Sequence, residues 1–312
     1  MNFKSAVSIV KGNDVQHMVK ESVELIGGIK NFVKRNDRVL LKPSLPVLKP
    51  PETGMATDLR IVEALIELVG NADAGEIIVA EGSATLDLDQ IDELQEILQR
   101  TGAKAVDLNK ITNVETEFVK VPQFLALEEI PIPRIVMDTD VFINIPKLKT
   151  GGAVTTIGIK NLVGVLRGKG AFSDPATLAP PFKPAGDKNI LHQFGQSKDE
   201  MFLNALIDLN SVVHSDLTVV DALIGREGRG YAKGRPVKMN LIIAGNDIVA
   251  VDAVCSAVMG YDPSMIKYIT LATLQGLGTG NLDKIDIKGV PIKEVMQRFE
   301  PTYDEYTNFY LN

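Results

Sequence analysis

The sequence predicts an α/β protein whose mostly parallel sheet is covered by helices on both faces. Short apolar runs of strand type alternate with amphipathic helical stretches through most of the 312 residues. These apolar runs are continuous, which is typical of parallel strands buried on both faces. Hydrophobic residues make up 45% of the chain and charged residues 23%, as in a globular protein with a large core. Alternation of this kind places helices on the two faces of one sheet.

The alternation is most regular in the first half of the chain. Asn13 or Asp14 would cap a helix that ends near Lys34, and Thr57 or Asp58 would cap the next helix. A third helix is expected over 88–100. The strands expected between these helices are 6–10, RVLL at 38–41, EIIVA at 76–80 and KAVDL at 104–108.

The stretch 111–133 interrupts this rhythm and reads as an edge strand or a hairpin with a proline-rich connection. The pattern then resumes with a strand over 140–146. The elements expected after it are helices over 200–213, 247–259 and 263–274, strands over 216–225, 238–245 and 284–289, and a closing helix. We expect one domain over 1–312, with two lobes at 1–125 and 126–312. The Gly/Pro-rich segment 168–189 has no periodicity, so it is either a functional lid or disordered.

Composition and charge exclude several classes of protein. The net charge is -7 and the pI about 5.2, without the dense basic block of a nucleic-acid binder. The single cysteine, Cys255, excludes an intrachain disulfide and an iron–sulfur cluster held by this chain alone. No apolar run approaches the length of a membrane span, and the start has no signal-peptide pattern. These features predict a cytoplasmic protein without a membrane partner, and they leave the oligomeric state open.

Polar and charged residues follow almost every predicted strand. Ligands of open parallel sheets bind beyond the carboxyl ends of the strands, so these residues are expected to gather at one edge. They form the first set of candidate ligand-binding and metal-binding residues. The set comprises Lys42, Ser44, Glu81, Ser83, Lys147, Lys149, Asp221 and Asp247.

The stretch IPKLKTGGAVTTIGIKNLVG, residues 145–164, is the strongest candidate binding segment. Thr155 or Thr156 would cap a helix over 157–166, whose exposed amides and positive dipole end attract an anion. Lys147 and Lys149 would add positive charge, and Lys160 would reach back one turn. A phosphate or carboxylate is the expected guest. The alternative is a capped helix flanked by solvated lysines.

Two further patterns are weaker candidates. IGREGRGYAKGRP, residues 224–236, is either a basic loop that contacts an anion, with Arg229 in it, or an ordinary turn. Asp221 and Asp247 are the candidate ligands of a cation such as Mg²⁺. His192 follows the segment 168–189 and is the one histidine considered as an acid or base.

These segments together resemble the DUF362 family of bacterial and archaeal proteins. VLLKPS is similar to its Lys-Pro-Asn segment, and VFINIPKLKT with TTIGIKNLVG is similar to its Pro-Lys-x-Lys-Thr and Lys-Asn-x-x-Gly signature. VVDALIGREGRG with LIIAGNDIVAVDAVCSAVMGYDP is similar to its C-terminal half. The chain departs from the pattern at Ser44 (commonly Asn), Gly151 (commonly His) and Tyr231 (commonly Pro). The family's function is unknown, and the cysteine module of some relatives is absent from this sequence.

The sequence therefore predicts an enzyme acting on a small anionic metabolite in a lysine-rich cleft. Lys42 and Lys147 would bind the anion, and Asn161 would orient it. Lys149, Lys160 and His192 are the catalytic candidates, because a buried lysine loses its proton readily. A non-catalytic carrier of a phosphorylated cofactor, or an accessory protein of a redox partner, is the alternative. The substrate and any cofactor are not indicated.

Overall fold

A mixed sheet of ten strands forms the centre of the protein in the computed structural model, which describes residues 5–47, 49–82, 87–112, 115–166, 183–184, 198–229 and 233–311. Its strand order is β13-β1-β12-β11-β7-β2-β3-β4, with β8 joined to β11 and β9 to β8. The strands are β1 Ala6–Lys11, β2 Arg38–Pro43, β3 Glu76–Glu81, β4 Lys104–Asp107, β7 Val141–Ile145, β8 Lys147–Gly151, β9 Val154–Thr156, β11 Leu217–Glu227, β12 Arg235–Gly245 and β13 Asp286–Gly289.

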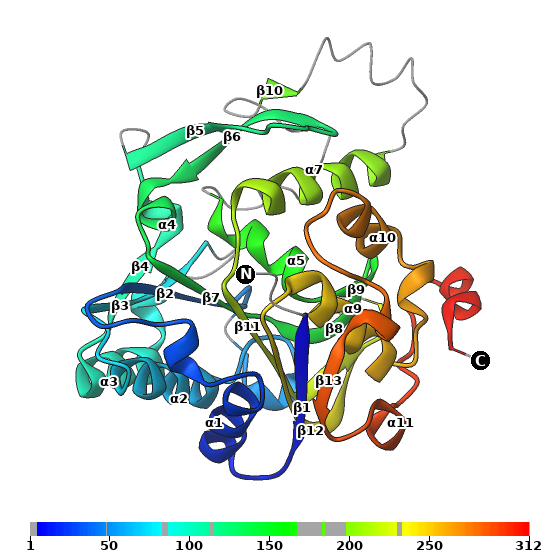
Figure 1. Cartoon of the computed structure of the whole chain (residues 1–312), viewed down its shortest axis with the longest axis horizontal. Helices are drawn as coiled ribbons and strands as arrows, with labels where there is room; N and C mark the ends of the chain where they lie inside the picture. The colour runs from blue at the N-terminus through cyan, green and yellow to red at the C-terminus, as the bar shows by residue number, and fades with distance from the viewer. Residues whose placement is uncertain are drawn as a thin grey trace.

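Helices cover both faces of this sheet (Figure 1). The helices are α1 Val15–Leu25, α2 Leu59–Gly70, α3 Asp92–Thr101, α4 Arg134–Met137, α5 Gly158–Asn161, α7 Lys198–Val212, α9 Ile248–Val258, α10 Lys267–Leu274 and α11 Ile292–Val295. Helices α1, α2 and α3 pack on one face. On the other face, α9 and α10 cover the half near β1 and β12, and α4 and α7 cover the half near β2 and β3. The predicted α/β class is confirmed.

Strand β12 departs from the parallel arrangement that the sequence predicted. It pairs antiparallel with β11 and with β1, whereas β1–β13, β11–β7, β7–β2, β2–β3 and β3–β4 are parallel. The connection between β11 and β12 is short, and a short connection returns the chain alongside the preceding strand. The stretch 224–236 is therefore the end of a hairpin. As a result, β12 ends at the sheet edge opposite to the carboxyl ends of β2, β3, β7 and β11.

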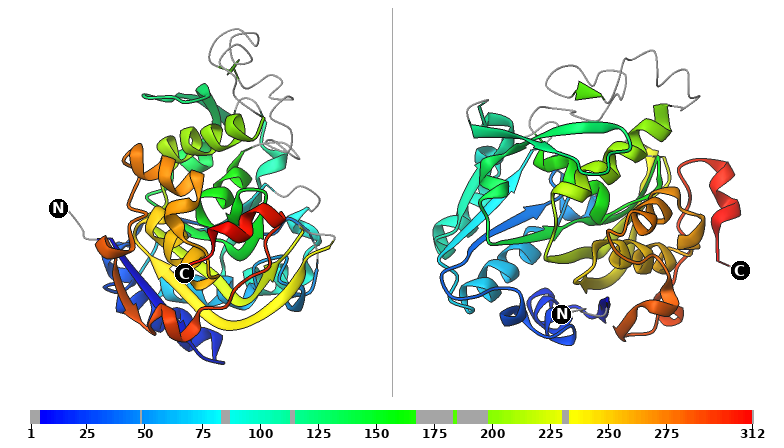
Figure 2. Two further views of the ribbon diagram at one scale, coloured as in Figure 1. Left: turned by 90° about the vertical axis from the view of Figure 1, so that its right-hand side faces the viewer. Right: turned by 45° about the horizontal axis from the view of Figure 1, so that its top comes forward.

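A second, smaller sheet lies above α7 (Figure 2). Its strands are β5 Thr116–Lys120, β6 Leu127–Pro133 and β10 Lys183–Pro184, in the order β10-β6-β5. The β5–β6 pair is antiparallel, which agrees with the hairpin alternative for 111–133. The Asp208 carboxylate of α7 accepts three backbone N–H bonds of 2.7 Å from 125–127 and ties this hairpin to the helix.

Several predicted elements end elsewhere than expected. Helix α1, capped by Asp14, stops at Leu25 and not near Lys34, because Gly27 and Gly28 adopt φ values of 114° and 84° that terminate the helix. The main sheet also joins both expected lobes, since β1 pairs with β12 and β13. Among the described residues, no helix combines the length and apolar character needed to cross a membrane.

Candidate functional site

A buried ion pair between Lys42 and Glu81 lies at the carboxyl edge of the sheet. Lys42 is on β2 and Glu81 ends the neighbouring β3, and the Lys42 Nζ lies 3.1 and 3.0 Å from the two Glu81 oxygens. The backbone N–H of Leu45 donates to the same carboxylate at 3.0 Å. Burial lowers the pKa of the Lys42 ammonium, although the Glu81 carboxylate opposes this effect. The parallel register brings the two residues together, as their positions after predicted strands suggested.

Gly164 lies directly against this ion pair. A Cβ at Gly164 would lie 2.2 Å from Glu81 Oε1 and 2.7 Å from Lys42 Nζ, so no side chain fits there. Its carbonyl also accepts a 2.7 Å hydrogen bond from the Gly82 N–H. The glycine that closes the segment 145–164 therefore allows the backbone to cover the Lys42–Glu81 pair.

Asn161 connects α5 to two strands of the sheet. Its Oδ1 lies 3.3 Å from the Lys42 Nζ, and its Nδ2 donates to the Lys42 carbonyl at 3.2 Å and to Asn144 Oδ1 at 2.8 Å. The Asn144 amide in turn donates to the Gly158 carbonyl at 3.1 Å. These bonds fix the orientation of α5, and with it the position of the adjacent Lys160.

Lys149 and Lys160 complete a group of positive charges around Lys42. Lys149, on β8, is buried and its Nζ lies 3.3 Å from Ser44 Oγ. Lys160, on α5, is half-buried, and its Nζ lies 5.1 Å from the centre of the Phe202 ring. Burial lowers the pKa of Lys160 to about 8, and the nearby Lys149 and Lys42 charges contribute to this shift. We call Lys42, Ser44, Glu81, Lys149, Lys160 and Asn161 the lysine cluster.

Lys147 takes part in a separate buried ion pair on the same strand as Lys149. Its Nζ lies 2.7 Å from Asp221 Oδ2, and both side chains are buried. The Asp221 carboxylate also accepts the backbone N–H of Asp58 at 2.7 Å and that of Leu223 at 3.0 Å. Three protein donors therefore bind this carboxylate, and the pair connects β8, β11 and the start of α2.

The predicted anion site at the start of a helix over 157–166 is wrong. The helical stretch starts with α5, Gly158–Asn161, and continues as a 3-10 helix over Leu162–Val165, close to the predicted bounds, but its N-cap Ile157 makes no side-chain capping bond. The N–H groups of Gly158 and Ile159 donate to the Asp252 carboxylate at 2.7 and 3.2 Å. The protein's own carboxylate therefore occupies the place expected for a ligand anion.

Asp252 belongs to a fully buried polar network behind the lysine cluster. Its carboxylate also accepts the Tyr268 hydroxyl at 3.0 Å, and burial raises the pKa of Asp252 to about 7. Thr155 lies in this network, 2.8 Å from the Tyr268 hydroxyl and 3.2 Å from Ser256 Oγ. Thr156 lies in β9, in register with Lys149. Neither threonine is a helix cap, because the chain is still in strand conformation at both positions.

The structure does not bring the remaining candidates into the lysine cluster. Arg229 lies at the end of the β11–β12 hairpin, is exposed, and its guanidinium lies 3.9 Å from Asp304. Ser83, His192 and all of the segment 168–189 except 183–184 lie outside the described residues. The residues that the sequence analysis missed are Gly164, Asn144 and Phe202, of which only Gly164 carried a signal, as the last residue of the segment 145–164.

Asp221 and Asp247 do not form the predicted Mg²⁺ site. Asp221 pairs with Ile242 in register, and Asp247 follows Gly245, which pairs with Thr218. At about 3.3 Å per residue, more than roughly 10 Å separates them along the strands. The described residues contain no group of three or more acidic, histidine or cysteine side chains arranged for a metal ion. The antiparallel course of β12, which places Asp247 at the opposite edge, explains the error.

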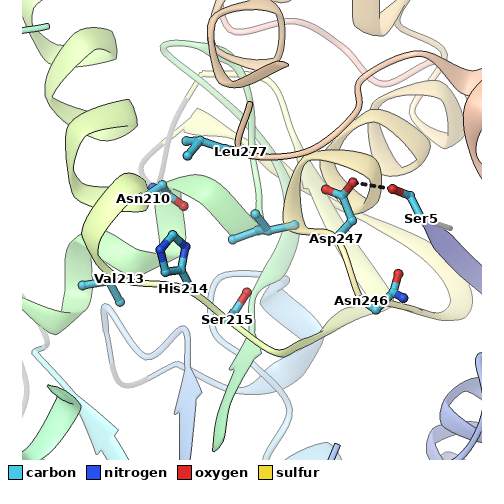
Figure 3. A pocket seen from close by; sticks show the side chains of 9 residues that line it. Ser5, Asn210, Val213, His214, Ser215, Asn246, Asp247 and Leu277 are labelled. Carbon is cyan, nitrogen blue, oxygen red and sulfur yellow. Dashed lines mark hydrogen bonds between the residues drawn. The ribbon is translucent and has the colours of Figure 1, made fainter. Parts of the chain in front are cut away.

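At that opposite edge Asp247 lines a pocket of about 250 Å³ (Figure 3). Its carboxylate caps α9 through the N–H groups of Val249 and Ala250 at 2.9 and 3.0 Å. It also accepts the Ser5 hydroxyl at 2.7 Å and the Thr279 N–H at 3.0 Å. All of these partners are helix-capping or loop-closing contacts, so the position of Asp247 is explained by structure alone.

Comparisons with known proteins identify the family of this chain. A family model described as a domain of unknown function, DUF362, matches residues 39–257. The chain belongs to the DUF362 family. A thylakoid-associated protein, sll1697, of Synechocystis sp. is 28% identical over 268 residues, which cover 82% of this chain and 73% of that protein. The lactate racemase apoprotein of Thermoanaerobacterium thermosaccharolyticum has a TM-score of 0.47 and 11% identity, over 82% of this chain and 57% of that one.

Gly151 stands where the pattern of the DUF362 family commonly has histidine, and the fold gives a physical reason for the glycine. A Cβ at Gly151 would lie 2.0 Å from Thr156 Oγ1 on the paired strand β9. A side chain here would clash with the Thr156 side chain in its present position. In this DUF362 protein the position is therefore closed to a histidine unless Thr156 also moves.

Proposed function

We propose that this protein is an enzyme that acts on a small metabolite carrying a phosphate or carboxylate group. The observation that supports the proposal best is the lysine cluster itself. It collects the ammonium groups of Lys42, Lys149 and Lys160 from three different elements around a single carboxylate, that of Glu81. Counted over the described members of the lysine cluster, three lysines and one glutamate give an excess of positive charge at this edge of the sheet.

Such an excess is costly for a protein to hold without an anion. Like charges in a partly buried place repel each other more strongly than in water, because the local dielectric constant is low. An incoming phosphate or carboxylate relieves this repulsion and gains charge-assisted hydrogen bonds. The location agrees with the rule that ligands of open α/β sheets bind beyond the carboxyl ends of the strands.

Lys160 is the residue that we propose for the chemistry. A pKa of about 8 leaves an appreciable neutral fraction near neutral pH, so the amine can accept a proton from a bound substrate. Lys42 and Lys147 are less suited to this role, because each is held by a carboxylate within 3.1 Å. Lys149 would hold the anionic group.

Anion titration of matched variants tests the binding part of this proposal. Sulfate serves as the probe because its charge is constant over the relevant pH range. We expect Lys149→Met or Lys160→Met to lose about ten- to a hundredfold in sulfate affinity, since one charge-assisted contact contributes about 1.5 to 3 kcal/mol. The melting temperature should stay unchanged or rise, because removing one of several like charges relieves repulsion.

Lys11→Met is the control, since Lys11 is an exposed lysine at the end of β1. Isothermal titration calorimetry and thermal melting on the same samples provide both readouts. Unfolding of both cluster variants with sulfate affinity intact in the soluble fraction would identify the lysines as structural ion-pair partners. A metabolite that co-purifies and is released unchanged would favour the alternative, a carrier protein.

A further inference from the structure

We propose that Lys160 forms an imine with a carbonyl group of the bound anionic ligand. The inference rests on the proposed function, because the anion would be held by Lys149 while the carbonyl group meets Lys160. The ligand class is then a small aldehyde or ketone that also carries a phosphate or carboxylate, such as a 2-oxo acid. A residue that bonds covalently to the ligand defines a substrate class more narrowly than charge alone.

Lys42 and Lys147 are each held by a carboxylate. Lys42 has two contacts to Glu81 and a third, at 2.9 Å, to the Pro43 carbonyl. Lys147 has a 2.7 Å contact to Asp221. These contacts occupy both amines, so neither Lys42 nor Lys147 is placed to meet a carbonyl group of a ligand.

Lys160 differs because, in the part of the chain that the structure describes, a ring and not a carboxylate faces its amine. Within the described residues, no Asp or Glu oxygen lies within 4.0 Å of Lys160 Nζ, whereas the Phe202 ring centre lies at 5.1 Å. Nearby positive charge and removal from water activate a lysine as a nucleophile, and the Phe202 ring attracts an ammonium more weakly than a carboxylate does. The shift of the Lys160 pKa to about 8 has this same physical origin.

The position of Lys160 is also fixed, which a nucleophile requires. The adjacent Asn161 is bonded to Lys42 and Asn144, and the α5 amides are bonded to Asp252. The backbone beneath Lys160 is thus tied to β2, β7 and α9. A carbonyl compound whose anionic group is bound at Lys149 would therefore meet the amine of a lysine whose backbone is held by hydrogen bonds.

The step balances without any further reactant. The neutral Lys160 amine adds to the carbonyl carbon, a C–N bond forms, and the carbonyl oxygen leaves as water after receiving two protons from the nitrogen. No oxidation or reduction occurs. The resulting imine is cationic when protonated. The positive charges of the neighbouring lysines disfavour this protonated form, and the anionic group of the bound substrate offsets them.

Reductive trapping on the full-length protein tests the proposal. Pyridoxal 5′-phosphate is the probe, because it joins an aldehyde to a phosphate, and pyridoxal is the matched control without the phosphate. Each is added at pH 7, sodium borohydride reduces any imine, and peptide mass spectrometry measures the occupancy of every lysine. At pH 7 about one in ten amines with a pKa near 8 is neutral, against roughly one in three thousand for an ordinary lysine.

We therefore expect Lys160 to be labelled more than tenfold faster than the exposed Lys11 and Lys20. Pyridoxal 5′-phosphate should also label Lys160 at least tenfold faster than pyridoxal does. Lys160→Arg keeps the positive charge but has no primary amine to form an imine, so this variant should lose the label. Labelling of Lys149 in place of Lys160, or equal labelling of all lysines, would overturn the imine.

The same samples distinguish the two failures. If sulfate binds with the expected dependence on Lys149 and Lys160 but no imine is trapped, the anion site stands and the covalent step is wrong. If sulfate binding does not depend on Lys149 or Lys160, the proposed function itself is wrong. Labelling of Lys160 without any preference for the phosphate-bearing aldehyde would show a reactive lysine and no anion recognition, and it would also overturn the proposal.

Discussion

At the scale of single residues, the proton on Lys160 determines how strongly an anion is bound. Its pKa of about 8 in the free protein lies below the ordinary lysine value, because burial and the charges of Lys149 and Lys42 disfavour the ammonium form. An anion binds best to the ammonium form. Affinity for sulfate should therefore be constant below pH 7 and fall as the pH rises through 8, by up to about tenfold per pH unit.

Calorimetric titrations of sulfate between pH 6 and 10 measure this dependence. In Lys160→Met the decline above pH 8 should disappear, because the titrating group is gone. An unchanged decline in that variant would assign the proton to another group and remove Lys160 from the site.

Gly164 gives a second test at this scale. A Cβ there would lie 2.2 Å from Glu81 Oε1, so Gly164→Ala must separate Glu81 from Lys42 or shift the backbone. Overpacking of this kind costs about 1 to 3 kcal/mol of unfolding free energy. Gly152→Ala is the matched control, since nothing lies within 4 Å of a Cβ at Gly152. Urea unfolding compares the free energies of unfolding of the two variants. Equal values would show that the Lys42–Glu81 pair can rearrange without loss of stability.

At the scale of elements, α5 depends on a carboxylate that lies 94 residues away in sequence. Burial raises the pKa of Asp252 to about 7, well above the value of an unfolded aspartate. Between about pH 4 and 7 the folded protein keeps a proton that the unfolded chain has released, so stability falls as the pH rises across this window and is level above it. The total contribution is a few kcal/mol.

Asp252→Asn should remove this part of the pH dependence, because an amide does not titrate. The difference in unfolding free energy between the two proteins, measured in urea at pH 5 and pH 8, isolates Asp252 from other carboxylates. A difference that is the same at both pH values would contradict the raised pKa.

The elements also show which parts of the site were predictable. Lys42 and Glu81 each end a strand in an apolar run, so the parallel arrangement alone places them side by side. The partners of Lys147 and Lys149 were not predictable, because β8 leaves β7 and pairs with β11. The contact of Asp252 with the first amides of α5 was not predicted either. Local sequence indicated Thr155 or Thr156 as the cap, whereas the actual acceptor is a carboxylate distant in sequence.

At the scale of the whole molecule, one strand direction accounts for the largest error in the predicted site. Asp247 was expected with the other strand-end residues because β12 was taken as one of the parallel strands of a mostly parallel sheet. The glycine-rich stretch after β11 was read as either a basic loop or a turn, and the turn reverses the chain. The class of fold follows from periodicity, whereas the direction of one strand depends on a connection whose geometry the sequence leaves ambiguous.

The pairing of β1 has a consequence for how the protein folds. Among the described strands, β1 pairs with β12 and β13, which come late in the chain, and the Ala6 N–H donates to Asn246 Oδ1, 240 positions away. During synthesis β1 therefore has no strand partner yet when β2 and the two strands that pair with it, β3 and β7, have already left the ribosome. Contacts this distant in sequence form late and slowly. In refolding experiments with pulsed hydrogen exchange, the amides of β1 should gain protection after those of β2 and β7, and earlier protection of β1 would show that another contact holds it first.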